Sequence, residues 1–257
     1  MISPVNLELD RVIDGQKFES CNVWYVLRTP QSSVDEGSKP RLPFGERVAE
    51  IIETFPLLDH HVIDVKQSDL LGLVKAMAGI VKAELAIDTG VEFVFNVSSS
   101  TRTAAYAIML VAGCCPAPVK ILYLRPKEDI TLMEIVASKD KTLDEIRQNL
   151  LEHGEAHSPF TAEYYPVIPF ATFTPTERAI LARLATNRLA ESVSSLVQAI
   201  APETKAPSRK DLVKVGWSVK ALERMHLVTS SKANHSRMIV ITPEGEVVAA
   251  ASTMISD

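Results

Sequence analysis

The sequence predicts an α/β protein: a Rossmann-like parallel sheet flanked by helices, followed by a C-terminal winged helix-turn-helix domain. Two patterns indicate this fold class. In the first half, short apolar runs alternate with longer amphipathic stretches, as they do when helices cover both faces of a parallel sheet. In the last third, three helical stretches precede two short strand-like runs, the order of a winged helix-turn-helix. We expect a Rossmann-type domain at 1–126, a connector with one helix (about 141–153) at 127–171, and the winged domain at 172–257.

Five short runs have the composition of strands that are buried on both sides. They are rich in Val, Ile, Phe and Tyr, and most of their successive side chains are apolar, as expected when helices cover both faces of a sheet. These runs are 1–5, 22–28, 61–65, 91–97 and 119–125.

Helical patterns lie between these runs. In residues 45–55 the apolar side chains recur at i, i+3, i+4 and i+7, the spacing of one helix face. Residues 68–86 repeat the pattern, with Ser68 or Asp69 as the cap. Residues 104–112 are nearly all apolar, which predicts a helix buried on several sides.

The C-terminal third opens with a helix start. Thr174, Pro175 and Glu177 supply a capping hydroxyl, a proline at the first helical position and a glutamate three residues after the cap. They predict a helix over 174–185. The elements expected after it are a helix at 191–201, a third helix from Ser208 with a break near Gly216, strands at 227–231 and 237–242, and a closing helix at 242–251.

Hydroxyl groups and one arginine gather where the fourth strand turns into a helix, in the stretch FNVSSSTRTAAYAIM. One hydroxyl would be enough to cap that helix. A helix N-terminus also attracts anions, and ligands of parallel sheets bind beyond the carboxyl ends of the strands. A helix cap and an anion site therefore both remain open on these residues alone. The residues concerned are Ser98, Ser99, Ser100, Thr101, Arg102 and Thr103, with Asn6, Asp10 and Arg11 after the first strand at the same edge.

Several common sites have no counterpart in the sequence. The glycine-rich fingerprints GxGxxG and GxxxxGK[ST] are absent, which argues against a dehydrogenase or an NTPase, and there is no GxSxG elbow. His60, His61 and Asp64 lie in or beside a strand, where His61 and Asp64 would point to opposite faces, so we expect no metal. We expect no cofactor, and we interpret Cys114 and Cys115 as packing residues.

Positive charge is concentrated near the C-terminus. The whole chain has a formal net charge of −5, but residues 172–257 hold eleven basic and eight acidic residues. Between 205 and 237, eight of ten charged residues are basic, which suggests a polyanionic partner such as double-stranded DNA. Apolar residues such as Met225 would face the core, and Trp217 would be a core residue or a DNA-backbone contact. The expected DNA-facing residues are Arg209, Lys210, Lys214, Ser218, Lys220 and Arg224 on the third helix, with Lys232 and Arg237 on the wing.

The composition favours a cytoplasmic protein with no membrane partner. Hydrophobic residues make up 46% of the chain, but no apolar stretch approaches the roughly 18 uncharged residues of a membrane span. The first ten residues lack the features of a secretory signal. Three cysteines provide no disulfide framework, which agrees with a reducing compartment.

Three stretches resemble the archaeal CARF regulators, in which a CRISPR-associated Rossmann fold domain is joined to a winged helix-turn-helix. SPVNLELDRVI (3–13) is similar to the opening PVG-x-D-x-x-R of a related archaeal group, with Asn6 where that group has glycine. EFVFNVSSSTRTAAYAIM (92–109) is similar to that group's strand–loop–helix motif W-V-N-V-S-S-x-x-R-T. The segment 227–246, which ends RMIVITPEGE, is similar to the end of its winged helix. The resemblance covers most of the chain apart from the connector.

The resemblance implies a homodimer formed through the Rossmann-like domains. Two copies of the loop at 98–103 would then face each other and bind a nucleotide second messenger, a cyclic oligoadenylate and most often the tetra-adenylate. Asn6, Asp10 and Arg11 would line the pocket from the first strand. CARF domains often have Gly and Lys in this loop, whereas this chain has serines, threonines and Arg102.

Three functions remain open from the sequence. The first is a dimeric regulator of transcription whose DNA binding responds to a nucleotide. The second is an enzyme of the ring-nuclease type, in which the loop positions a ribose 2′-hydroxyl for cleavage of the cyclic ligand. No general base is evident beside the motif, so we expect no enzyme. The third is a protein-interaction module that uses the winged helix to bind a partner.

Overall fold

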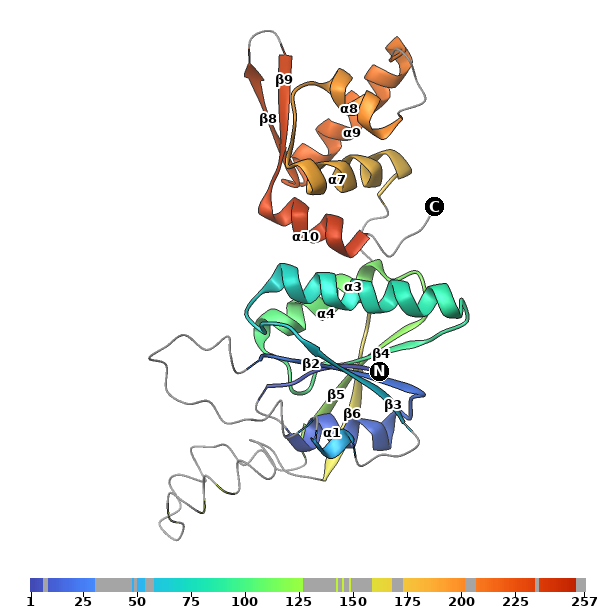
Figure 1. Ribbon diagram of the computed structural model, residues 1–257, viewed down its shortest axis with the longest axis vertical. Coiled ribbons are helices and arrows are strands. Elements are labelled where there is room, and N and C mark those ends of the chain that lie inside the picture. Colours follow the sequence, from blue (N-terminus) through green and yellow to red (C-terminus); the bar gives the residue numbers. More distant parts are fainter. Residues whose placement is uncertain are drawn as a thin grey trace. The chain divides into compact units, whose positions relative to one another are not determined.

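The computed structural model consists of two compact units, Met1–Ile168 and Pro169–Asp257 (Figure 1). Each unit has its own hydrophobic core. The structure describes residues 1–6, 9–30, 48, 50–53, 58–126, 142, 145, 148, 159–167, 173–201, 207–233 and 236–252.

The N-terminal unit is built on one six-stranded sheet with the order β3-β2-β1-β4-β5-β6. Neighbouring strands from β3 to β5 are parallel, and β6 runs antiparallel to β5. The predicted α/β class with a mostly parallel sheet is confirmed. The strands are β1 (Ile2–Pro4), β2 (Val23–Arg28), β3 (Asp59–Asp64), β4 (Phe93–Asn96), β5 (Val119–Pro126) and β6 (Phe160–Tyr165).

Burial along the strands follows their place in the sheet. β1 and β4 lie in the middle and are buried throughout, as their apolar composition predicts. β3 lies at the edge, and no side chain in it is fully buried. The expectation that all five predicted strands would be buried on both sides is therefore wrong for β3, and β2 and β5 are buried only in part.

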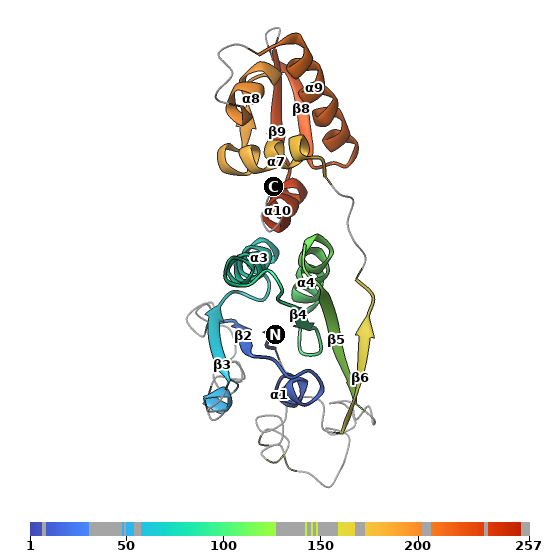
Figure 2. The same ribbon diagram turned by 90° about the vertical axis from the view of Figure 1, so that its right-hand side faces the viewer.

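Helices cover both faces of this sheet. Figure 2 shows α3 and α4 over one face and α1 over the other. Val48 and Ile52, from the helix predicted at 45–55, are fully buried in the same core cluster as α1. The helix predicted at 141–153 lies almost wholly outside the described residues. The bounds are α1 (Leu9–Phe18), α3 (Leu70–Ile87) and α4 (Arg102–Cys114).

The sequence analysis did not predict α1 and β6. α1 is only ten residues long and has Gly15 in its interior, a residue that weakens helices. The glycine is explained by packing, because a Cβ at Gly15 would lie 2.6 Å from Asn96 Nδ2 on β4. β6 falls in the segment treated as a connector, and its antiparallel pairing with β5 is a contact between distant residues that no local pattern reveals.

The C-terminal unit contains the predicted three helices, two strands and closing helix. The start of its first helix is confirmed, since Thr174 and Glu177 form a capping box. A short strand between the first two helices, β7, was not predicted, and the third helix continues through Gly216 without a break. The strands form an antiparallel sheet in the order β7-β9-β8. The elements are α7 (Pro175–Asn187), β7 (Leu189–Ala190), α8 (Val193–Ile200), α9 (Arg209–Arg224), β8 (Val228–Ala233), β9 (Ser236–Ile241) and α10 (Pro243–Ser252).

In the described part of the chain, none of the helices combines the length and the apolar character needed to cross a membrane.

Two glycines of the C-terminal unit should respond oppositely to alanine. A Cβ at Gly245, in the first turn of α10, would lie 2.0 Å from the carbonyl oxygen of Leu227, so α10 must shift. We expect Gly245→Ala to destabilise the unit by about 1–3 kcal/mol, the usual cost of overpacking. A Cβ at Gly216, in α9, meets no atom within 4 Å. Gly216→Ala should stabilise the unit by about 0.5–1 kcal/mol, since alanine is the better helix former. Scanning calorimetry of the full chain measures both changes, and equal effects of the two substitutions would contradict the close contact at Gly245.

Candidate functional site

The strand order reverses between β1 and β4, and the carboxyl ends of these two strands with the segments that follow them are called here the crevice. The chain leaves β1 toward α1 on one face of the sheet and leaves β4 toward α4 on the other face (Figure 2). In open α/β sheets, the carboxyl ends of two such strands are where ligands bind. The two loops in which the sequence predicts site residues follow β1 and β4, so the fold brings both to this crevice.

Direct hydrogen bonds join the two loops. The backbone N–H of Asn6 donates to Ser99 Oγ at 3.1 Å, across 93 positions of sequence. Arg11 Nη1 donates to the carbonyl oxygen of Ser98 at 3.3 Å, and the Arg11 guanidinium lies 5.6 Å from the centre of the Tyr123 ring. Arg11 is only 9% exposed. Its charge therefore lies below the surface, where it holds the loop after β4.

The buried side chain of Asn96 fixes the same loop from β4. Its Nδ2 donates to the carbonyl oxygen of Arg11 at 3.1 Å, and its Oδ1 accepts from the backbone N–H of Ser98 at 3.1 Å. The side chain is 1% exposed. Sequence reasoning did not include Asn96 among the candidate residues, although it directly precedes the loop.

Most hydroxyl groups of the loop stabilise the fold. Ser98 Oγ accepts from the backbone N–H of Leu124 at 2.8 Å, and Ser100 Oγ donates to the carbonyl oxygen of Val97 at 2.6 Å. Thr101 is the N-cap of α4, because its Oγ1 accepts from the N–H of Ala104 at 3.1 Å. The helix-cap interpretation is thus confirmed for Thr101.

Other groups of the loop face the solvent. Arg102, the first residue of α4, is exposed, and Thr103 and the Asp10 side chain of α1 are partly exposed. The first backbone N–H groups of a helix have no partner within the helix, and they form the positive end of its dipole. Arg102 and the N-terminus of α4 can therefore act together on an anion.

Gln67 belongs to this edge of the sheet and was missed from the sequence. Its side chain is 6% exposed, and Nε2 donates to the carbonyl oxygen of Leu27 at 2.9 Å. Its backbone carbonyl accepts from Thr101 Oγ1 at 3.0 Å, and its backbone N–H donates to Thr29 Oγ1 at 3.0 Å. Gln67 thus ties the end of β2 to the cap of α4. Gln67 lies just after the predicted strand 61–65, and this position could have identified it as a candidate site residue.

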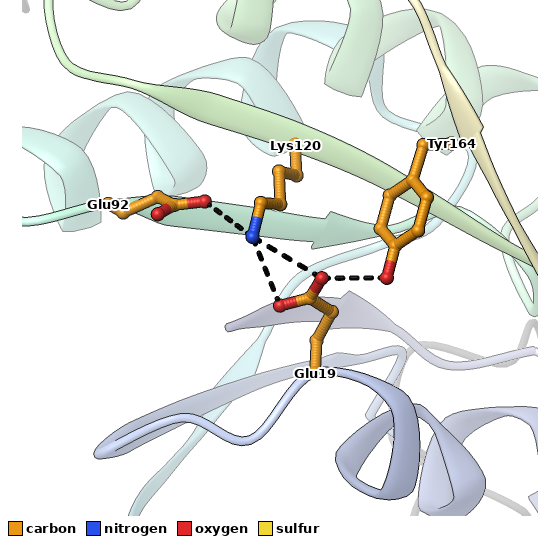
Figure 3. A network of polar contacts seen from close by, with 4 residues as sticks. All are labelled: Glu19, Glu92, Lys120 and Tyr164. Carbon is orange, nitrogen blue, oxygen red and sulfur yellow. Dashed lines mark hydrogen bonds and ion pairs between the residues drawn. The ribbon is translucent and has the colours of Figure 1, made fainter.

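A cavity of about 450 Å³ opens at the opposite edge, near the amino ends of β1, β2, β4 and β5. Figure 3 shows four residues beside it, of which Lys120 Nζ lies 2.9 Å from Glu92 Oε1 and 3.4 Å from Glu19 Oε1. Tyr164 Oη donates to Glu19 Oε1 at 2.6 Å. Hydrogen bonds to Glu92 and then Glu19 raise the pKa of Lys120. The network joins Glu19, which follows α1, to β5 and β6, so these contacts stabilise the fold.

The residues considered for a metal are spread apart. His61 stacks on Tyr25 with ring centres 4.9 Å apart, and Asp64 pairs with Arg28 at 2.8 Å. Among the described residues, no group of three His, Cys, Asp or Glu side chains could hold a metal ion. Burial raises the pKa of the Cys114 thiol to about 11, so it stays protonated near neutral pH.

In the C-terminal unit, α9 exposes a row of cations. Leu212 and Ser218 are half-buried, and Val215, Val219 and Leu222 face the core. The expectation that Met225 faces the core is wrong, since it ends the helix and is 40% exposed. The exposed cations are Arg209, Lys210, Lys214, Lys220 and Arg224.

Arg237, on the wing of the predicted DNA surface, is paired with an acid, whereas the cations of α9 are exposed. Arg237 Nη2 pairs with Glu223 Oε2 at 2.5 Å and its Nε donates to Ser230 Oγ at 2.6 Å. Burial would raise the pKa of Glu223, but hydrogen bonds from Ser230 and Arg237 lower it overall, so the carboxylate stays charged. The charge of Arg237 is thus neutralised within the unit. The side chain of Lys232 lies outside the described residues.

Trp217 is not a core residue, because 62% of it is exposed. Lys220 Nζ lies 5.2 Å from the centre of the Trp217 ring, within the range of a cation–π contact.

Comparison with known proteins matches the N-terminal half of the chain to a family, and the solved structures similar to the chain include Csm6 and Can2. Residues 1–129 match the family model described as "HFX_2341_N:-like, N-terminal". No curated protein sequence matches the chain. Csm6 of Enterococcus italicus, bound to cyclic hexa-2'-fluoro-hexa-dAMP, is similar at 13% identity and a TM-score of 0.44, over 88% of this chain and 55% of its own. Can2 of Sulfobacillus thermosulfidooxidans, in complex with cyclic tetra-adenylate, is similar at 11% identity and a TM-score of 0.34, over 97% of this chain and 61% of its own. The chain spans less than two thirds of either protein.

Replacing Asn96 tests how strongly it holds the loop. We expect Asn96→Ala to destabilise the N-terminal unit by about 2 kcal/mol or more, because the Arg11 carbonyl and the Ser98 N–H would be left buried without their partner. The chain has two tryptophans, of which Trp24 is fully buried in this unit, so its fluorescence reports the unfolding of this unit in urea. Asn22→Ala, at an exposed position, is the control and should change stability by less than about 0.5 kcal/mol. Equal stability of the two variants would contradict the role of Asn96.

Proposed function

The chain belongs to the HFX_2341_N-like family through residues 1–129, and from this premise we propose that it is a dimeric, ligand-responsive regulator of transcription. In this proposal the N-terminal domain is a CARF-type, Rossmann-like domain that senses a cyclic oligoadenylate or a related nucleotide. The C-terminal unit is a winged helix-turn-helix that binds DNA.

The observation that carries the sensing role is Arg102 at the start of α4. It is exposed at the crevice between β1 and β4, on a helix whose N-terminus points its free N–H groups there. A guanidinium and a helix N-terminus together suit a phosphate group. A ligand with several phosphates and two-fold symmetry would suit two copies of this arrangement in a homodimer.

The observation that supports DNA binding is the positive surface of α9. The order of elements in the unit is that of a winged helix-turn-helix, in which the third helix enters the major groove. Five cations of α9 are exposed, and the acid of its first turn, Asp211, is held by Ser208 in the N-terminal cap. Phosphate binding needs such a surface of one sign.

We propose that the ligand is bound without being cleaved. Arg11, the second cation beside the loop, is buried and engaged with Ser98. The hydroxyls of Ser98, Ser100 and Thr101 are likewise used within the fold, so the loop after β4 meets the ligand with Arg102 and the start of α4, which bind phosphate but do not abstract a proton.

Arg102→Ala tests the sensing site. Titration calorimetry of the full chain with cyclic tetra-adenylate, cyclic hexa-adenylate and linear tetra-adenylate would identify the ligand. The substitution should weaken binding of the preferred one at least tenfold, since a hydrogen bond to a charged group contributes about 1.5–3 kcal/mol. Arg183→Ala, an exposed arginine of α7, is the control and should leave the affinity unchanged. Unchanged affinity in Arg102→Ala would refute the site, and shorter oligonucleotides among the products after incubation would refute binding without cleavage.

Lys214→Ala tests DNA binding separately. Fluorescence anisotropy of a labelled duplex at several salt concentrations should show weaker binding and a slope of log K against log salt that is smaller by about 1. Lys75→Ala, an exposed lysine of α3, is the control and should leave the slope unchanged. Binding of the native protein that does not vary with salt would contradict a phosphate-binding surface.

A further inference from the structure

The solvent face of α9 carries an apolar centre between cationic ends. Its residues recur at helical spacing and lie opposite Val215, Val219 and Leu222, which face the core. At the centre are Val213, 51% exposed, and Trp217, 62% exposed, one helical turn apart. The full face, called here the α9 ridge, consists of Lys210, Val213, Trp217, Lys220 and Arg224.

The cations of the ridge show which kind of partner suits it. A single exposed apolar residue is common on protein surfaces and needs no explanation. Here Lys210 lies before the apolar pair, and Lys220 and Arg224 lie after it. Lys220 also lies over the Trp217 ring, so its charge is kept beside the apolar pair. A partner must therefore offer anions on both sides of a small apolar group.

The major groove of DNA has this arrangement. Phosphates line both of its edges, and the C5-methyl group of thymine is the apolar group that the base pairs present at its floor. Four residues along a helix span about 6 Å, close to the rise of two base pairs of about 3.4 Å each. The centres of Val213 and Trp217 are thus spaced to reach different base pairs in one groove.

We propose that Val213 and Trp217 read thymine methyl groups in the major groove while Lys210, Lys220 and Arg224 hold the flanking phosphates. The proposal rests on DNA binding by α9 and adds the chemistry of its sequence preference. Val213 and Trp217 are then specificity residues, and the cations supply affinity for any sequence.

Methyl groups can be removed from or added to DNA without altering base pairing. We would measure binding of the full chain to an alternating A·T duplex of 30 base pairs and to the same duplex with deoxyuridine in place of thymidine. In an alternating G·C duplex, replacing cytosine by 5-methylcytosine adds a methyl group instead of removing one. That methyl group occupies the same place in the groove as the methyl group of thymine. The native protein should bind each methylated duplex more tightly, by about fourfold for each methyl group that it buries.

Two substitutions assign the preference to the ridge. Val213→Ala and Trp217→Ala should each reduce the ratio of affinities for thymine and uracil duplexes toward one, with affinity for the uracil duplex little changed. Both residues are exposed, so we expect neither substitution to disturb the core. Leu189→Ala, at an apolar residue of β7 that is 47% exposed, is the matched control and should keep the native ratio.

The outcomes separate this inference from DNA binding itself. Equal affinity of the native protein for methylated and unmethylated duplexes, with the usual salt dependence, would overturn methyl reading and leave DNA binding intact. Binding to none of the duplexes at low salt would overturn both. If Trp217→Ala changes the molecular mass in solution but not the thymine preference, the ridge is a protein interface and the inference is wrong.

Discussion

The candidate site depends on the buried side chain of Asn96. It bonds the carbonyl of Arg11 in α1 and the N–H of Ser98 in the loop after β4, so one amide joins the segments that follow the two central strands. Gly15 makes this possible, since a larger residue there would collide with the amide nitrogen. The conformation of the loop is therefore set by the fold, and Arg102 and the start of α4 are held in place at the crevice.

The loop uses its polar groups for two different tasks. Ser98, Ser100 and Thr101 satisfy backbone groups at the ends of β4 and β5 and at the start of α4. A buried backbone group without a partner is costly, so these hydroxyls are needed for stability. The exposed guanidinium and the first N–H groups of α4 remain for an external anion. In the proposed function, this serine-rich loop therefore binds phosphate chiefly through groups that are not serine hydroxyls.

In the C-terminal unit, ion pairing decides which cations are neutralised within the fold. Glu223 of α9 bonds Ser230 of β8 and pairs with Arg237 of β9, so the helix is tied to the strands by one carboxylate. The positive charge of Arg237 is used there. Among the described residues of this unit, exposed cations gather on α9, where they flank Val213 and Trp217. The Glu223 network thus stabilises the fold, and in the proposed function the α9 ridge recognises DNA.

The sequence by itself determined the element types and several helix starts. Burial of β1 and β4 and the caps at Thr101, Thr174 and Ser208 follow from patterns within a few residues. The tertiary structure alone decided the strand order, the presence of α1 and β6, the exposure of Trp217 and the pairing of Arg237. It also brought Asn6 to Ser99, Asn96 to Arg11 and Gln67 to Thr101. Local patterns depend on neighbours along the chain. Each of these features depends instead on a contact between residues that only folding brings together. For that reason the sequence could indicate a site but not which of its side chains are free to bind.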